Sequence, residues 1–356
     1  MRVIELSDGP AAGFAGMLLA QLGHEVIRVE LPWRGPQPPT AVLNETERAY
    51  LHRGKQTVSF GDDPAYRGPL FELAITADAL VEDLGRGGIG RYGLTVHALR
   101  KAKRDLVVAS ISPYGHSGPK SRWAASELTI QASAGVLHST GWVGETPFKA
   151  GGFPAHYIAG IHAATAVLAR VFGVHAGASR GGRIEVSMQE AYLHHWTRHI
   201  GEWAYTGTKM RREKQGFGHQ GFRHTAMAAD GWLYILALYA DWESIALFLG
   251  LEDFVTGEWG DPAYRANHWQ DLEETFARNV AARSRYDWFA DAAAAGYTFA
   301  PVHAAEDQLT NPQFAARGFL RESEVQGRVV PCPGLPFPWD SPAPAPPTIT
   351  TEDPNG

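Results

Sequence analysis

The chain begins with Arg2-Val-Ile-Glu-Leu6, continues with Pro10-Ala-Ala-Gly-Phe-Ala-Gly-Met-Leu-Leu-Ala-Gln-Leu22 and then reaches Val26-Ile-Arg-Val-Glu30. The two short apolar runs predict strands. The run between them predicts a helix, because a proline stands near its start and Gly23 follows its end. Two strands that are joined by a helix pair in parallel, and helices then cover the faces of the sheet. This opening predicts an α/β domain.

The alternation of helices and strands continues through the first 200 residues or so, which predicts one α/β domain over residues 1–205. The expected elements are helices at 66–76, 96–103 and 157–172 and strands at 79–82, 106–111 and 183–188.

The pattern changes after Tyr205. A charged connector at 209–215 is followed by a predicted hairpin at 226–236, with Asp230-Gly231 as its turn, and by further helical segments. We expect a smaller α+β domain over residues 206–310. Residues 311–356 should return to the large domain, and the proline-rich part from Pro331 to Pro347 should form an extended strap over its surface.

Composition narrows the function classes. The 356 residues carry 32 basic and 38 acidic side chains, a net charge of −6 with neutral histidines. This balance argues against nucleic-acid binding through phosphate contacts. The single cysteine, Cys332, excludes an intramolecular disulfide framework and fits a reducing compartment. No signal peptide and no apolar run of about 18 residues is visible, so we expect a cytoplasmic chain without a membrane span.

Gly85-Arg-Gly87-Gly-Ile-Gly90 matches the dinucleotide pattern GxGxxG. The nicotinamide fingerprint belongs to the first β-α-β unit, and here it lies elsewhere, which argues against a nicotinamide oxidoreductase. Two interpretations stay open at this point. The loop could bind the phosphates of another nucleotide with Arg86 and Arg91, or it could be a tight turn with solvated arginines.

Metal and nucleophile motifs are weak. His194, His195 and His199 lie close together, but no HExxH order and no paired cysteines accompany them, so no metal site is expected. Glu127 begins a predicted helix, and His156 heads another after Gly151-Gly152-Phe153-Pro154-Ala155. Both placements suit a functional site, and both equally suit an ordinary helix start.

Taken together, ten blocks of the chain resemble the class III CoA-transferases, the family of the formyl-CoA and carnitine CoA-transferases and the α-methylacyl-CoA racemases. Their order and spacing span about 330 residues. The blocks are Val3–Ser7, Met17–Glu30, Arg53–Val58, Val81–Leu94, Ser110–Pro119, Leu128–Gly135, Arg180–Met188, Ala229–Trp232, Ala300–Val302 and Asn311–Gly318.

The resemblance implies a Rossmann-like large domain, a smaller domain and an interlocked dimer. It also implies that the Gly85 loop binds coenzyme A as part of an acyl-CoA substrate. Arg91 matches the family's phosphate-binding arginine, and Lys55 matches a basic position. Asp83 and Leu84 match an Asn-Phe pair beside the CoA, with both side chains changed.

The chain departs from this family at the nucleophile. The family's catalytic aspartate falls at His156, within Ala155-His-Tyr-Ile-Ala-Gly160. A carboxylate can form an acyl anhydride and then hold CoA as an enzyme thioester, whereas an imidazole cannot hold CoA in this way. The histidine that racemases place before their aspartate is also missing, because Ser126 and Glu127 stand there. Glu127 does match an acidic position of the family.

Three hypotheses follow. In the first, the chain is a subunit of a CoA-transferase for an acyl-CoA and a carboxylic acid, and a homologous partner carries the catalytic aspartate. In the second, it is an acyl-CoA racemase, isomerase or lyase that uses His156 with Glu127. In the third, it binds CoA esters without catalysis.

Overall fold

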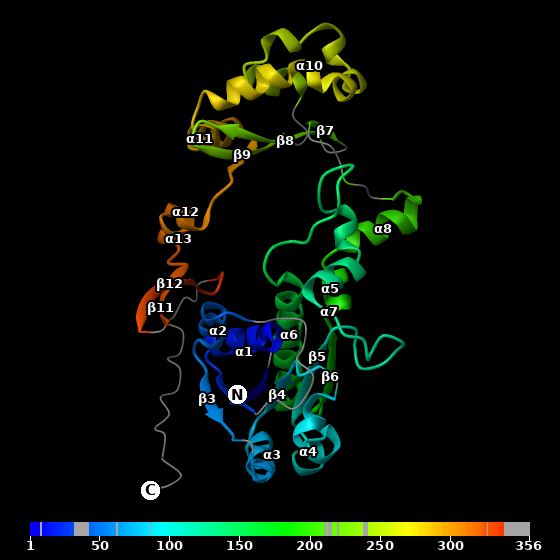
Figure 1. The fold of residues 1–356 in the computed structure, drawn as a ribbon, viewed down its shortest axis with the longest axis vertical. Coiled ribbons are helices and arrows are strands. Elements are labelled where there is room, and N and C mark those ends of the chain that lie inside the picture. The colour runs from blue at the N-terminus through cyan, green and yellow to red at the C-terminus, as the bar shows by residue number, and fades with distance from the viewer. Residues whose placement is uncertain are drawn as a thin grey trace. The chain divides into compact units, whose positions relative to one another are not determined.

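The structure of the chain is a computed structural model, which describes residues 1–7, 9–31, 43–61, 63–85, 87–209, 212, 216–218, 221–237, 241–325 and 327–337. The chain forms two compact units (Figure 1). The first contains Met1–Thr140, Pro147–Met210 and Arg317–Gly356, and the second contains Gly141–Thr146 and Arg211–Ala316.

The first unit is built on a six-stranded sheet in the order β3-β2-β1-β4-β5-β6. All five strand pairs are parallel, which confirms the α/β class that the opening residues predict. The order reverses beside β1, and ligands of parallel sheets collect at the carboxyl ends of the strands near such a point. The strands are β1 (Arg2–Leu6), β2 (Glu25–Glu30), β3 (Gln56–Ser59), β4 (Ala79–Glu82), β5 (Val107–Ser112) and β6 (Gly182–Ser187).

Helices cover both faces of this sheet. Successive strand residues point to opposite faces, so that Val3 of β1 joins the core beneath α1 and α6 while Ile4 joins the core beneath α3 and α4. The helices are α1 (Pro10–Gln21), α2 (Glu45–His52), α3 (Arg67–Thr76), α4 (Val96–Ala102), α5 (Glu127–Ser133), α6 (Pro154–His175), α7 (Met188–His194) and α8 (Thr197–Thr206).

The central helix pair is α1 and α6. Their backbones approach closely at Gly160, where an added Cβ would lie 2.6 Å from the carbonyl oxygen of Ala11. Within the described part of the chain, α6 alone is long and apolar enough to cross a membrane by length and composition. Its buried residues pack on the sheet and on α1, as the core helix of a globular unit does.

The chain re-enters the first unit near its end as a hairpin of β11 (Leu320–Val325) and β12 (Arg328–Pro333). Arg53, which follows α2, forms hydrogen bonds to both strands of this hairpin. Its Nη2 donates to the carbonyl oxygen of Pro333 at 2.7 Å, and its Nη1 donates to Ser323 Oγ at 3.4 Å. Much of the predicted proline strap, from residue 338 onward, lies outside the described residues.

The second unit has an antiparallel sheet in the order β10-β9-β8-β7, covered by helices. The predicted hairpin is present, but its turn lies at Ala229 and Asp230, one residue earlier than expected, because Ala228 pairs with Gly231. The elements are β7 (Gly216–Gly218), β8 (Gly221–Ala228), β9 (Gly231–Ala237), β10 (Thr298–Pro301), α9 (Trp242–Phe248), α10 (Pro262–Ala281), α11 (Arg285–Ala295), α12 (Ala305–Leu309) and α13 (Pro312–Ala316).

His224 of β8 makes the stability of the second unit depend on pH. Its ring packs against Trp269 and Phe276, with ring centroids 5.2 and 4.7 Å away. Burial lowers its pKa to about 4. In the unfolded chain this imidazole is protonated below about pH 6.5, whereas in the folded chain it stays neutral down to about pH 4. The free energy of unfolding is therefore largest above pH 6.5 and falls as the pH drops toward 4.

We expect His224→Phe to remove up to about 3 kcal/mol of this acid sensitivity. Denaturant titrations at pH 7 and pH 4.5, followed by tryptophan fluorescence, measure it. His97 is exposed, so His97→Phe is the matched control and should leave the difference in unfolding free energy between pH 7 and pH 4.5 unchanged. An acid sensitivity that is equal in the parent and in His224→Phe would contradict this assignment.

Candidate active site

Most of the residues that the sequence singles out gather at the carboxyl edge of the parallel sheet. Asp83, Leu84 and Gly85 follow β4 directly, and the loop that leaves β5 ends at Glu127. His156 lies in the first turn of α6, which begins at this same edge because α6 runs back to the start of β6. The fold thus brings these five positions to one edge, although they are spread over more than 70 residues of sequence.

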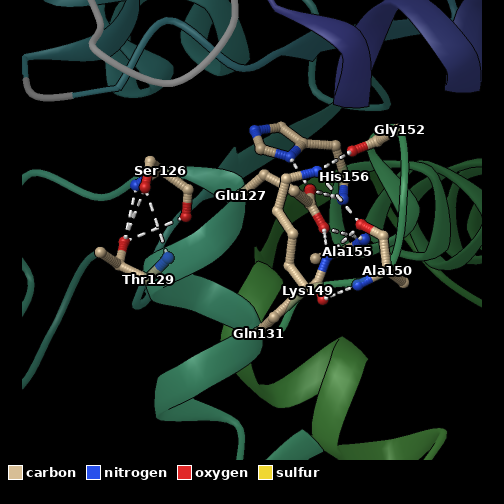
Figure 2. A network of polar contacts seen from close by, with 9 residues as sticks. All are labelled: Ser126, Glu127, Thr129, Gln131, Lys149, Ala150, Gly152, Ala155 and His156. Atoms are coloured by element: carbon tan, nitrogen blue, oxygen red, sulfur yellow. Dashed lines mark hydrogen bonds and ion pairs between the residues drawn. The ribbon is translucent and has the colours of Figure 1, made fainter. Parts of the chain in front are cut away.

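Glu127 and His156 form a buried pair (Figure 2). Glu127 Oε2 lies 2.6 Å from His156 Nδ1, and the two side chains are 5% and 2% exposed. The capping Ser126 begins α5 and so fixes where Glu127 stands. The backbone N–H groups at the start of α6 point at the same carboxylate, from Ala155 at 3.0 Å and from His156 at 3.4 Å.

Both carboxylate oxygens of Glu127 are occupied. Oε1 accepts from Ala155 N and Gln131 Nε2, and Oε2 accepts from His156 N and Nδ1, which makes four donors in all. Burial raises the pKa of Glu127, but the hydrogen bonds from His156, Ala155 and Gln131 lower it more, and the net pKa lies below the ordinary value. Glu127 is therefore a fixed anion and a hydrogen-bond acceptor, with no oxygen left for another partner.

Gln131 supports the Glu127–His156 pair and was missed by the sequence reasoning. It is wholly buried one turn after Glu127. Its Nε2 donates to Glu127 Oε1 at 2.7 Å, and its Oε1 accepts from Ala150 N at 2.9 Å. The amide therefore ties the Glu127 carboxylate to the loop that leads into α6. The i, i+4 spacing of Glu127 and Gln131 on one helix face is the signal that could have revealed it.

Lys149 supplies a cation at the same loop. Its Nζ donates to the carbonyl oxygens of Ala150 at 3.1 Å and Gly152 at 3.4 Å, and its side chain is exposed (Figure 2). The site thus combines a buried anion, an imidazole and an exposed ammonium.

The loop after β4 is held by Arg91, which lies in a short 3₁₀ helix over Gly88–Tyr92. Its guanidinium donates to the carbonyl oxygen of Leu84. Gly87 has φ +86°, a conformation that favours glycine, and an added Cβ there would lie 3.1 Å from Arg91 Cγ. The glycines therefore let this loop fold tightly around Arg91. Arg86, the second arginine of the loop, lies outside the described residues.

One carboxylate oxygen of Asp83 has a structural role. Its Oδ2 accepts from Ala12 N at 3.0 Å and so caps the start of α1, where Gly9 offers no side chain of its own. An added Cβ at Gly9 would lie 2.8 Å from that oxygen. A larger residue at position 9 would clash with Asp83. The packing of Asp83 therefore explains this glycine of the first β-α-β unit, and no bound nucleotide is needed to explain it.

A polar cavity of about 310 Å³ opens at this edge. Leu84 is the predicted residue that lines it, and the sequence reasoning missed its two cations, Arg28 and Arg48. Arg28 is 8% exposed and pairs with Glu30 at 2.5 Å. The full lining comprises Leu6, Ser7, Arg28, Val29, Glu30, Leu31, Arg48 and Leu84. Arginine beside a strand end suits phosphate groups.

The side chain of Lys55 is buried within the first unit. Its ammonium lies inside the first unit, 2.5 Å from Glu5 Oε2 and 2.7 Å from the carbonyl oxygen of Gly13, and neither charged side chain is exposed. Its structural role is to neutralise Glu5 between β1 and α1, whereas the CoA contact stays a prediction from the resemblance.

Among the residues that the structure describes, no group of three His, Cys, Asp or Glu side chains is arranged to hold a metal ion. Of the three histidines that the sequence analysis considered, the ring of His194 lies 5.4 Å from that of His162, and His199 stacks on Trp196 at 4.7 Å.

The sequence profile of CoA-transferase family III matches residues 1–354, and the chain belongs to this family. The succinate–glutarate CoA-transferase of Agrobacterium fabrum is 26% identical, and the match covers 93% of this chain and 86% of that protein. Subunit BbsE of the succinyl-CoA:(R)-benzylsuccinate CoA-transferase of Thauera aromatica is 26% identical, with 94% and 86% covered.

A solved structure gives the same fold. A CAIB/BAIF family protein from Brucella suis superposes with a TM-score of 0.82 at 23% identity, and the match covers 96% of this chain and 92% of that one. The resemblance drawn from the sequence blocks is confirmed at the level of family and fold. Because the named relatives above are CoA-transferases, the racemase-type alternative is not favoured.

Proposed function

We propose that this chain is a subunit of a CoA-transferase that moves CoA between an acyl-CoA and a carboxylic acid, and that a homologous partner chain supplies the catalytic aspartate. The observation that carries the proposal is the state of Glu127. It is the carboxylate beside His156, and both of its oxygens are already occupied by four donors.

Transfer through the enzyme needs a carboxylate that is free to attack the thioester. The carboxylate becomes acylated, releases CoA and then receives it back as an enzyme thioester. Glu127 is buried and fully hydrogen-bonded, and its neighbour at the end of the loop is His156 rather than a second acid. An imidazole cannot hold CoA through a thioester bond. In this proposal the attacking carboxylate belongs to the partner.

The name of one relative supports assembly with a second chain. BbsE of Thauera aromatica is called a subunit of its CoA-transferase, and it is 26% identical to this chain over 361 residues. We propose that this chain likewise assembles with a homologue as an interlocked dimer in the cytoplasm.

We assign CoA binding to the loop after β4 and to the adjacent polar cavity. Arg91 is the residue that best fits the phosphates, since a guanidinium makes paired contacts with them. The nearby arginines Arg28 and Arg48 line the cavity of about 310 Å³ beside Leu84. Gly85 supplies the bend of the loop, with φ +69°.

We expect Arg91→Ala to weaken CoA binding by about 10-fold to 100-fold, because a charged hydrogen bond contributes roughly 1.5–3 kcal/mol. Titration calorimetry with CoA measures the change. Arg104→Ala, an exposed arginine before β5 at the other edge of the sheet, is the matched control and should bind as the parent does. Equal affinities in Arg91→Ala and in the parent would remove Arg91 from the site.

The proposal is tested by expressing the chain alone and together with its nearest homologue that carries an aspartate at the position of His156. Native mass and transfer from succinyl-CoA to glutarate are measured on both preparations. The proposal predicts a mixed complex that transfers CoA and an isolated chain that does not. Transfer by the isolated chain at the rate of the complex would refute it.

A further inference from the structure

The His156–Glu127 pair has no chemical role in the proposed transfer. If the partner's carboxylate attacks the thioester, neither member of the pair is needed as a nucleophile. Yet the two side chains are almost wholly buried, and their closest atoms lie only 2.6 Å apart. Gln131 and two backbone N–H groups hold the carboxylate in place. A buried carboxylate aimed at one imidazole nitrogen is an arrangement with a definite chemical use.

The orientation of the ring determines that use. Glu127 is ionised and can only accept, so Nδ1 of His156 carries the proton that lies between them. A ring that is protonated at Nδ1 alone offers Nε2 as a base. Among the described residues, Nε2 has no hydrogen-bond partner, and Figure 2 shows this nitrogen pointing away from Glu127. Carboxylate on one nitrogen and an unoccupied base on the other is how a histidine is prepared to take a proton from an attacking oxygen.

Glu127 is also suited to support that proton transfer. Its own pKa is held low by its hydrogen bonds, so it stays charged while His156 becomes an imidazolium. The negative charge at 2.6 Å stabilises the imidazolium as it forms. Lys149 places an exposed ammonium on the loop that enters α6, where a developing oxyanion would find a cation.

We propose that this chain by itself hydrolyses acyl-CoA thioesters, with His156 as the general base that activates water. The water oxygen attacks the thioester carbonyl carbon, and its proton passes to His156 Nε2. The tetrahedral intermediate then collapses, the carbon–sulfur bond breaks, and the proton moves from Nε2 to the departing thiolate. The products are the free acid and CoA, and water is the only co-reactant.

This inference goes beyond transfer. It rests on the binding of a CoA thioester at this site, as the proposed function does, and not on the partner chain. A partner that covers the site would keep water out, so hydrolysis belongs to the chain alone and transfer belongs to the complex.

The test uses the full chain, purified without a partner, and the probes acetyl-CoA, benzoyl-CoA and succinyl-CoA. Free thiol is followed with a chromogenic disulfide, after subtraction of spontaneous hydrolysis, and binding of each thioester is measured by calorimetry. We expect thiol release from at least one bound thioester without any carboxylic acid acceptor. We expect His156→Gln to lower this rate by about 10²-fold or more, the usual contribution of a general base.

Two further variants separate catalysis from folding. Glu127→Gln keeps the size of the side chain and should lower the rate while the thioester still binds. His175→Gln, an exposed histidine at the far end of the same helix, is the matched control and should behave as the parent does.

The outcomes are distinct. A chain that binds a thioester and releases no thiol overturns the hydrolysis and leaves the transferase proposal standing. The same holds if His156→Gln, folded and able to bind, hydrolyses as fast as the parent, or if a rapidly quenched sample carries an acyl group on His156. Failure to bind any of the three thioesters would overturn both proposals.

Discussion

Replacing Lys55 with alanine is expected to lower the free energy of unfolding by about 3–5 kcal/mol, the cost of breaking a buried ion pair by removing one partner. Lys55 and Glu5 are both fully buried, with their charged atoms 2.5 Å apart. Burial raises the pKa of Glu5 and lowers that of Lys55, and the opposite charge of each partner counteracts this shift in the other. Without Lys55, the Glu5 carboxylate must either stay charged in the core or take up a proton.

Equilibrium denaturation of the parent and of Lys55→Ala at pH 7 measures the loss. Lys103→Ala is the matched control, because Lys103 forms a half-exposed pair with Asp78 at 3.7 Å. Such pairs contribute about 0–1 kcal/mol. A loss at Lys55 no larger than the loss at Lys103 would show that the buried pair is not formed in solution.

In the complex with its partner, we expect His156→Gln to change the rate of succinyl transfer by no more than about threefold, whereas asparagine in place of the partner's catalytic aspartate should reduce it by on the order of 10³ or more. The reason is the division of roles that Glu127 implies. Both of its oxygens already accept hydrogen bonds, so in this proposal the attacking carboxylate comes from the partner. His156 then forms no covalent bond to the acyl group or to CoA during transfer.

Both substitutions are made in the co-purified complex, and the rate of transfer from succinyl-CoA to glutarate is compared with the parent rate. Native mass confirms that each variant still assembles. A loss of 10²-fold or more in assembled His156→Gln would place the histidine in the transfer itself. It would then contradict the role of a supporting subunit.

The fold follows from the sequence because its signals are local. Strand, helix and strand occupy the first thirty residues, and each is recognisable from its own composition. The α/β class and the family are confirmed. The turn of the second unit's hairpin was misplaced by one residue, since Asp230-Gly231 is a strong turn signal and the pairing of Ala228 with Gly231 is set by the strands rather than by the turn.

The site was harder, because its contacts join distant segments. Glu127 and His156 were singled out by their places at predicted helix starts and then by their matches to a family. Their mutual distance of 2.6 Å, however, depends on how the loop after β5 meets α6. The resemblance assigns Lys55 to CoA, and the structure adds a buried ion pair with Glu5, which lies 50 residues earlier. No local pattern distinguishes a lysine that binds a phosphate from one that neutralises a buried acid.

Small residues carried information that only the packing reveals. Gly16 is the clearest case, because an added Cβ would lie only 1.8 Å from Glu5 Oε2. The first β-α-β unit contains Gly9, Gly13 and Gly16, whose spacing differs from that of a nicotinamide fingerprint. In the structure, Gly9 makes room for Asp83, Gly13 offers its carbonyl oxygen to Lys55, and Gly16 makes room for Glu5.

The most direct test of the central claim is the intact mass of each subunit after the complex is mixed with succinyl-CoA and quenched within a second. The account predicts that the partner chain gains the mass of a covalent acyl or CoA adduct while this chain keeps its unmodified mass at every time point. An adduct on this chain, at Glu127 or at His156, would contradict it.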